Sequence, residues 1–131
     1  MPLVYLNTYL RLIRKKEDTD RYKERFGYTN FKQILKKDVI WIHASSVGEF
    51  KSCDFIIDNF HKNYSLLITT TTKTAADYAL KNYGGKIIHQ YAPFDIVPWI
   101  NKFLNFWKPK LVVWIESDIW PNTIVRLREK N

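Results

Sequence analysis

Apolar residues gather in four short runs, and longer amphipathic stretches separate these runs. The runs are rich in valine, isoleucine and leucine and occupy residues 38–43, 65–69, 86–89 and 110–115. Continuous apolar runs of this length are typical of strands that are buried on both faces. The stretches at residues 50–61, 74–83, 96–107 and 119–130 have the apolar spacing or the alanine content of helices. Strand followed by helix, four times over, predicts an α/β fold with an open parallel sheet and flanking helices.

The first 36 residues follow a different pattern, so we divide the chain into an arm, 1–36, and an α/β domain, 37–131. Four apolar residues recur at helical spacing in the arm: Leu3, Leu6, Leu10 and Ile13. Arg11, Arg14, Lys15 and Lys16 then give this predicted helix a basic end. The helix is too short to span a bilayer, which needs about twenty apolar residues. An interfacial or docking helix and an ordinary packed helix are both open interpretations.

Charge and composition narrow the class of protein. The formal net charge is +8, and residues 1–40 hold ten Lys and Arg against five Asp and Glu. Such an arm suits an anionic partner, such as nucleic acid, an acidic membrane or a phosphorylated ligand, although it could also be a solvated surface. The single cysteine, Cys53, excludes an intrachain disulfide and favours a reducing compartment.

The segments that follow the four predicted strands are the place to look for a site, because open α/β sheets bind ligands at the carboxyl ends of their strands. They cover residues 43–49, 69–74, 90–95 and 116–122 and are rich in hydroxyls and carboxylates. Many of these side chains would serve as helix N-caps: Ser46, Thr72 or Thr74, Asp95, and Ser117 or Asp118.

Two carboxylates are the candidates for chemistry. Glu116 directly follows a buried run, where no helix needs it as a cap. Glu49 lies at a predicted helix start, and Gly48 before it would let a ligand approach the backbone. A carboxylate held there can accept a proton from an alcohol. Ser46 and Glu49 also fit the capping box S-x-x-E, so Glu49 could equally serve to start a helix.

The amino-acid sequences of these segments resemble those of a known family. The sequences WIHASSVGE (41–49), LITTTTKT (67–74), YAPFD (91–95) and ESDIWPN (116–122) occur in this order. Together they resemble the N-terminal domain of 3-deoxy-D-manno-octulosonic acid (Kdo) transferase, the lipid A glycosyltransferase family of Gram-negative bacteria. RYKERFG (21–27) is similar to an element that the family carries before its first strand. The resemblance covers the chain from about Arg21 to its last residue.

The resemblance implies a Rossmann-like domain, the N-terminal half of an inverting GT-B glycosyltransferase that transfers Kdo from CMP-Kdo to a lipid A precursor in lipopolysaccharide biosynthesis. By position in the motifs, Glu49 is the general base and Glu116 stabilises the transition state. The expected acceptor-binding residues are Ser45, Ser46, Gly48, Lys51, Thr72 and Lys73. The family implies no metal and no cofactor, and the three histidines lack the spacing of metal ligands. It also implies a peripheral or anchored position on the cytoplasmic side of the bacterial inner membrane.

The chain also departs from the family pattern. Lys73 and the Ala75–Ala76 pair stand where the family tends to have Pro and Thr-Gly, and Asp118 replaces a glutamate. No donor-binding domain follows residue 131, so we expect the isolated chain to transfer no sugar. Two alternatives remain open: another GT-B glycosyltransferase with a different acceptor, and a non-catalytic α/β module that binds an acidic partner. Nucleic acid is not the expected partner, because no known recognition motif is present.

Overall fold

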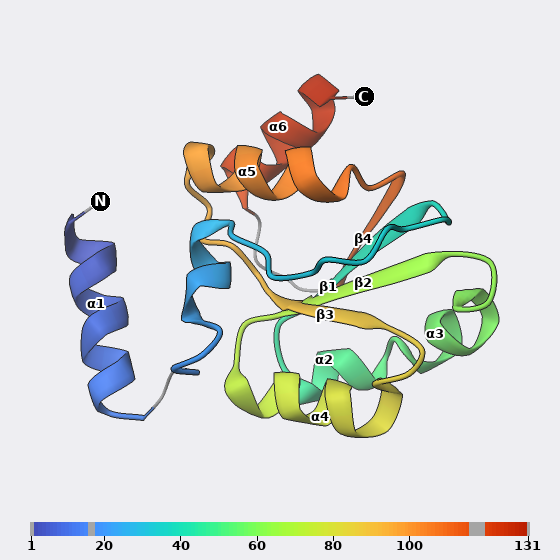
Figure 1. The fold of residues 1–131 in the computed structure, drawn as a ribbon, viewed down its shortest axis with the longest axis horizontal. Helices are drawn as coiled ribbons and strands as arrows, with labels where there is room; N and C mark the ends of the chain where they lie inside the picture. Colours follow the sequence, from blue (N-terminus) through green and yellow to red (C-terminus); the bar gives the residue numbers. More distant parts are fainter. Residues whose placement is uncertain (1, 16–17, 116–119, 131) are drawn as a thin grey trace.

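The computed structural model describes residues 2–15, 18–115 and 120–130 and shows a four-stranded parallel sheet between helices (Figure 1). The strands are β1 (Val39–Ala44), β2 (Ser65–Thr70), β3 (Ile88–Tyr91) and β4 (Leu111–Ile115), in the order β3-β2-β1-β4. The helices are α1 (Pro2–Ile13), the 3₁₀ helix η1 (Tyr22–Phe26), α2 (Val47–Lys51), α3 (Asp54–Phe60), α4 (Lys73–Tyr83), α5 (Val97–Trp107) and α6 (Pro121–Lys130). Every strand pairing is parallel. The predicted open α/β sheet is confirmed.

Helices cover both faces of the sheet, which explains why the strands appear as continuous apolar runs. Figure 1 shows α5 and α6 on one side of the sheet and α2, α3 and α4 on the other. Ile40 and Ile42 of β1 belong to the core under α2 to α4, whereas Trp41 between them packs on the α5 side. Trp41 and Ile42 are fully buried. Neighbouring residues of one strand therefore belong to two separate cores. Because both faces are packed, the strand sequence does not alternate between apolar and polar residues.

The helix predicted at residues 50–61 is wrong in one respect, because the structure divides it into α2 and α3. The amide of Ser52 donates to the Glu49 carbonyl at 3.1 Å, and the amide of Cys53 donates to the Phe50 carbonyl at 2.9 Å. These bonds span three residues instead of four and form a tighter turn than an α-helix. The result is a short separate helix, α2, whose first turn carries Glu49.

The segment η1 covers the edge of the sheet formed by β3. β3 is an edge strand, and its outward backbone groups need partners other than a fifth strand. The Glu24 carboxylate accepts the Tyr91 amide at 2.7 Å, and the Arg21 guanidinium donates to the His89 carbonyl at 2.9 Å. Arg21 also donates twice to Glu24, each time at 3.0 Å. Burial raises the pKa of Glu24 above its ordinary value, against the opposite effects of the Tyr91 amide and Arg21.

The arm helix α1 packs on η1 and α5 through aromatic contacts. The Tyr5 ring stacks on Phe26 with centroids 4.9 Å apart and meets the edge of Trp99 at 5.6 Å. Gly27 ends η1 with a φ of 79°, and a Cβ there would lie 2.3 Å from the Trp99 carbonyl oxygen, so only glycine fits. The division into residues 1–36 and 37–131 stays a prediction. Within the described ranges, no helix combines the length and apolar character needed to cross a bilayer.

Candidate active site

The loops that follow β1 and β2 are joined to each other at the carboxyl edge of the sheet. The Ser45 hydroxyl donates to the Thr71 hydroxyl at 3.0 Å, and the Thr71 amide donates to the Ser45 carbonyl at 3.2 Å. β1 and β2 are adjacent and parallel, so the residues that follow them emerge side by side. These two hydrogen bonds hold Ser45 and Thr71 together at the base of the candidate site.

Glu49 lies in the first turn of α2, next to Ser45, and completes a capping box. The Ser46 hydroxyl accepts the Glu49 amide at 3.4 Å, and the Glu49 carboxylate accepts the amides of Ser45 at 2.8 Å and Ser46 at 3.4 Å. The predicted capping box is therefore confirmed. Nothing lies within 4 Å of a Cβ placed on Gly48, so the backbone beside the carboxylate is open. The role of Glu49 as a base stays a prediction.

The other predicted acceptor residues lie on α2 and α4, two helices that contact each other. Thr72 caps α4, since its hydroxyl accepts the Ala75 amide at 3.1 Å. Lys73 is the first residue of α4 and is exposed. Lys51 ends α2, is exposed, and places its Nζ 5.8 Å from the centroid of the Tyr78 ring. The structure thus groups these side chains around one edge of the sheet. Their contacts with an acceptor stay predictions.

Glu116, the second predicted catalytic carboxylate, lies outside the described residues, as do Ser117 and Asp118. The strand before them ends at Ile115, which pairs with Ala44 at the end of β1. The chain therefore enters this segment at the same edge of the sheet as Ser45.

Sequence reasoning missed Arg25, a basic residue on η1 with only 3% of its surface exposed. Its guanidinium donates to the Thr71 carbonyl and lies over the Tyr91 ring, 4.8 Å from the centroid. The Arg25 carbonyl also accepts the Phe94 amide at 2.8 Å. Arg25 thereby connects η1 to the loops that follow β2 and β3. The available signal was its place within RYKERFG at residues 21–27, which we noted only as a family element.

Asp95 also behaves differently from the sequence interpretation. We expected it to cap the helix that follows it, but Ile96 holds the N-cap position of α5 and makes no side-chain cap. Asp95 instead accepts the amides of Asn122 at 3.1 Å and Thr123 at 2.8 Å in the first turn of α6. It lines a cavity of about 210 Å³ whose other walls are Arg25, Thr71, Ala92, Pro93, Phe94 and Trp120. This cavity adjoins the loop that carries Thr71.

Comparison with known families settles which family this arrangement represents. Residues 20–131 match the family model described as 3-Deoxy-D-manno-octulosonic-acid transferase (kdotransferase). The chain belongs to the Kdo transferase family. The expectation drawn from the four motifs is confirmed, and the polar edge described above is the carboxyl edge of a Kdo transferase domain.

Three curated relatives carry the same family name. The chain is 36% identical over 127 residues to the 3-deoxy-D-manno-octulosonic acid transferase of Rickettsia bellii, a match that covers 95% of this chain and 30% of the relative. It is 32% identical to the probable mitochondrial enzyme of Arabidopsis thaliana, over 95% of this chain and 28% of the relative. It is 30% identical to the Haemophilus influenzae enzyme, over 99% and 31%. The chain spans less than a third of the length of these relatives.

Two histidines lie in the sheet of this Kdo transferase domain, His43 fully buried and His89 half-buried. Nδ1 of His43 lies 2.8 Å from the Thr69 hydroxyl, and the ring packs against both Trp114 and Trp120, with centroids 4.5 and 4.6 Å away. Burial lowers the pKa of His43 to about 4 and that of His89 to about 3. Both are therefore neutral at physiological pH. Across the described ranges, no three His, Cys, Asp or Glu side chains gather in a way that could hold a metal.

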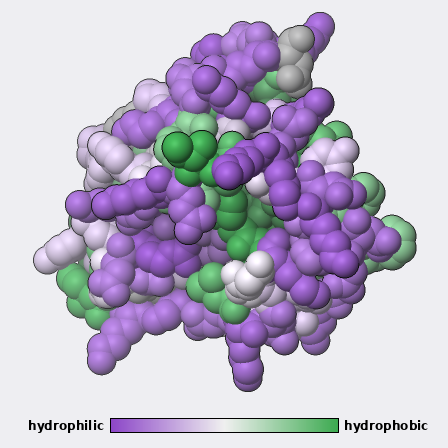
Figure 2. All heavy atoms as spheres, turned by 45° about the vertical axis from the view of Figure 1, so that its right-hand side comes forward, coloured by the Kyte–Doolittle hydropathy of each residue, from purple (hydrophilic) through white to green (hydrophobic). Residues whose placement is uncertain are grey.

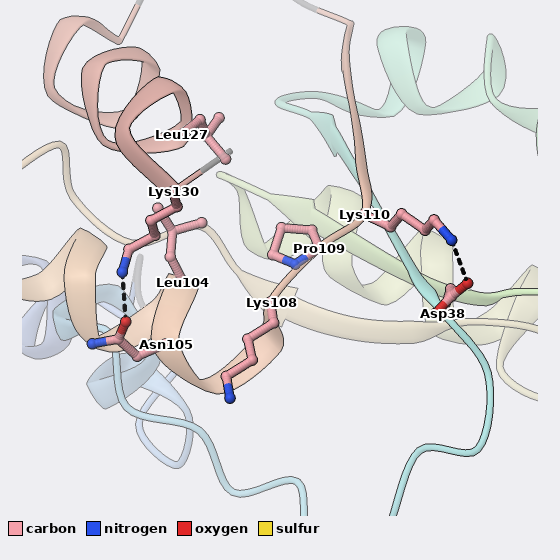
Figure 3. Close-up of a pocket in the computed structure, with 8 residues that line it drawn as sticks. All are labelled: Asp38, Leu104, Asn105, Lys108, Pro109, Lys110, Leu127 and Lys130. Carbon is pink, nitrogen blue, oxygen red and sulfur yellow. Dashed lines mark hydrogen bonds and ion pairs between the residues drawn. The ribbon is translucent and has the colours of Figure 1, made fainter.

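A larger cavity of about 500 Å³ lies at the opposite edge of the sheet (Figure 3). Lys110, just before β4, pairs with Asp38 at 3.1 Å, and Lys130 of α6 donates to Asn105 at 2.6 Å. The face turned forward in Figure 2 is mostly hydrophilic, with an apolar recess near its centre. Because Asp38 and Lys110 precede the amino ends of β1 and β4, this cavity is separate from the carboxyl edge that carries Glu49.

Proposed function

We propose that this chain is the acceptor-binding half of a Kdo transferase and that Glu49 is its general base. The observation that carries the proposal is the position of Glu49, a half-buried carboxylate at the carboxyl end of β1, in a chain that belongs to the family. The acceptor would be a lipid A precursor and the donor CMP-Kdo. A second Rossmann-like domain would hold the donor across a cleft, as in other GT-B enzymes.

The proposed reaction is one displacement. The acceptor hydroxyl gives its proton to the Glu49 carboxylate while its oxygen bonds to the anomeric carbon of Kdo. The bond from that carbon to the CMP phosphate oxygen breaks, CMP leaves with the bonding electrons, and the configuration inverts. Glu116 would stabilise the positive charge that grows on the sugar. No metal or cofactor takes part in this scheme.

Glu49 can reach an acceptor only by leaving its present partners. Its carboxylate now accepts the Ser45 and Ser46 amides, so it must turn outward as the acceptor hydroxyl arrives. The open space at Gly48 supports this motion, since nothing lies within 4 Å of a Cβ placed there. Ser45, Ser46 and Thr72 would then contact the acceptor, and Lys51 and Lys73 would contact its phosphates.

The surface of α1 supports a position at the cytoplasmic face of the inner membrane. Its outward residues are apolar, with exposed fractions of 78% at Leu3, 53% at Leu6, 42% at Leu10 and 62% at Ile13. Arg11, Arg14 and Lys15 follow this stripe. An apolar face with a basic end is suited to the boundary between lipid headgroups and acyl chains, where anionic lipids add attraction.

The test is Glu49→Gln in the chain combined with the part of the Rickettsia bellii relative that lies beyond the matched region. Glutamine can still complete a capping box, so the melting temperature should stay the same. It cannot accept a proton, so transfer from CMP-Kdo to a lipid A precursor should fall by about 10²- to 10⁴-fold. Asp38→Asn is the matched control, because it makes the same carboxylate-to-amide change at the opposite edge of the sheet and should keep the wild-type rate.

Each outcome separates the candidates. A Glu49→Gln protein that transfers Kdo at the wild-type rate would show that Glu49 only starts α2. A wild-type protein that moves no Kdo to a lipid A precursor, but does glycosylate another acceptor, would favour a different GT-B transferase.

A further inference from the structure

A continuous set of contacts runs from η1 to the Glu49 carboxylate. The Arg25 guanidinium donates to the carbonyl of Thr71, and the Thr71 hydroxyl accepts the Ser45 hydroxyl at 3.0 Å. The Thr71 amide donates to the Ser45 carbonyl at 3.2 Å, and the Ser45 amide donates to Glu49 at 2.8 Å. Thr71 and Ser45 are therefore the two residues between Arg25 and the carboxylate.

Arg25 is well suited to hold Thr71, the first residue in this series of hydrogen bonds, in place. It is 97% buried, its guanidinium lies 4.8 Å from the Tyr91 ring centroid and 6.0 Å from that of Phe94, and its backbone carbonyl is bonded to the Phe94 amide. Two aromatic faces hold a planar guanidinium in one orientation, which a lysine could not match. The loop after β2 is less buried, so its position depends on such an anchor.

We infer that Arg25 is a positioning residue for Glu49 and acts through Thr71 and Ser45. Of the two amides that donate to the Glu49 carboxylate, Ser45 makes the shorter bond, 2.8 Å against 3.4 Å for Ser46, and the Ser45 position depends on Thr71. Removing the guanidinium frees the Thr71 carbonyl, lets the loop after β2 move, and carries the Ser45 amide away from the carboxylate. The catalytic meaning of this arrangement rests on the proposed function, whereas the arrangement itself can be tested without any sugar transfer.

Arg21 provides a matched control on the same segment. Its guanidinium also bonds to the sheet edge and lies over the Tyr91 ring, 5.1 Å from the centroid, but its hydrogen-bond partners are Glu24 and the His89 carbonyl instead of Thr71. Arg21→Met and Arg25→Met each remove one guanidinium from η1 and keep an apolar stem of similar length. A purely structural role of η1 predicts the same behaviour from both variants.

The experiment follows the Ser45 amide by NMR across a pH titration of this chain. An amide that donates to a carboxylate changes its chemical shift when the carboxylate is protonated, so Ser45 reports on its bond to Glu49. In the wild type we expect a clear pH-dependent shift. Arg25→Met should lose most of it, Arg25→Lys should restore part of it, and Arg21→Met should keep it while losing thermal stability.

Thr71→Val tests the set at a second point and leaves the Arg25, Tyr91 and Phe94 side chains unchanged. It removes only the hydroxyl that Ser45 bonds, so the chain should fold and the Ser45 shift should weaken. The inference is overturned if Arg25→Lys and Thr71→Val both retain the full wild-type shift, or if Arg21→Met abolishes it as completely as Arg25→Met. Failure of Kdo transfer in the wild-type protein would contradict the proposed function, but it would not change the NMR result for the Ser45 amide.

Discussion

At the scale of single residues, Asp95 shows how a helix can be capped by a distant part of the chain. Its Oδ1 accepts both the amide and the hydroxyl of Thr123 at 2.8 Å, and its Oδ2 accepts the Asn122 amide at 3.1 Å. The first turn of a helix has amides without partners inside the helix, and a carboxylate there also suits the helix dipole. Asp95 therefore fixes α6 to the end of β3.

We predict that Asp95→Ala lowers the free energy of unfolding by about 1–2 kcal/mol, the range found when a helix cap is lost. Asp95→Asn keeps an oxygen that can accept from Thr123 and should lose less. Urea denaturation of both variants is the measurement, and Asp20→Ala, at an exposed position, is the control. Equal stability of the Asp95→Ala and wild-type proteins would show that α6 does not depend on this carboxylate.

At the scale of elements, α1 presents its more apolar face to solvent. We predict that Leu6→Glu with Leu10→Glu reduces binding to vesicles containing anionic lipid by about tenfold or more, since each buried leucine contributes about 1.5–3 kcal/mol when fully transferred. Leu6 is 53% and Leu10 42% exposed, so the melting temperature should change little. Vesicle co-sedimentation measures the loss.

The matched control for α1 is Ile34→Glu, which changes an isoleucine that is 90% exposed in the connection between η1 and β1. It adds the same charge without touching the α1 stripe and should bind vesicles as the wild type does. Undiminished binding of the double leucine variant would place the lipid contact elsewhere on the chain.

The elements differ in how well the sequence predicts them. The four strands were found because helices cover both faces of the sheet, so each strand is a short run rich in apolar residues. The break between α2 and α3 was not found, because both halves keep their apolar residues in phase and the tighter turn at Ser52 and Cys53 leaves no compositional mark. The role of η1 at the sheet edge depends on Glu24 and Arg21 meeting β3, which no local pattern encodes.

At the scale of the whole molecule, the site could be predicted as far as topology determines it. Parallel strands bring their carboxyl ends to one edge, so the positions of Ser45, Glu49 and Thr72 followed from the strand pattern alone. Arg25 could not be placed, because its partner Thr71 is 46 residues away in sequence. A contact between such distant residues arises only when the fold is complete.

The whole sheet should also lose stability in acid, because two of its histidines are held neutral. Burial lowers the pKa of His43 to about 4 and of His89 to about 3, whereas both would have ordinary values near 6.5 in the unfolded chain. As the pH falls below about 6.5, the unfolded state binds protons that the folded state cannot, so stability declines. The decline in stability ends near pH 4 for His43 and near pH 3 for His89, where the folded state also binds the proton.

The expected slope within this pH range is up to about 1.4 kcal/mol per pH unit for each histidine. His89→Gln removes one titrating group, and glutamine can still bond to the Thr70 hydroxyl that His89 Nε2 contacts at 2.8 Å. Urea denaturation at pH 7, 6 and 5 should therefore show a shallower decline for His89→Gln than for the wild type, and a still shallower one when His43→Gln is added. Identical slopes in all three proteins would mean that neither imidazole stays neutral inside the sheet.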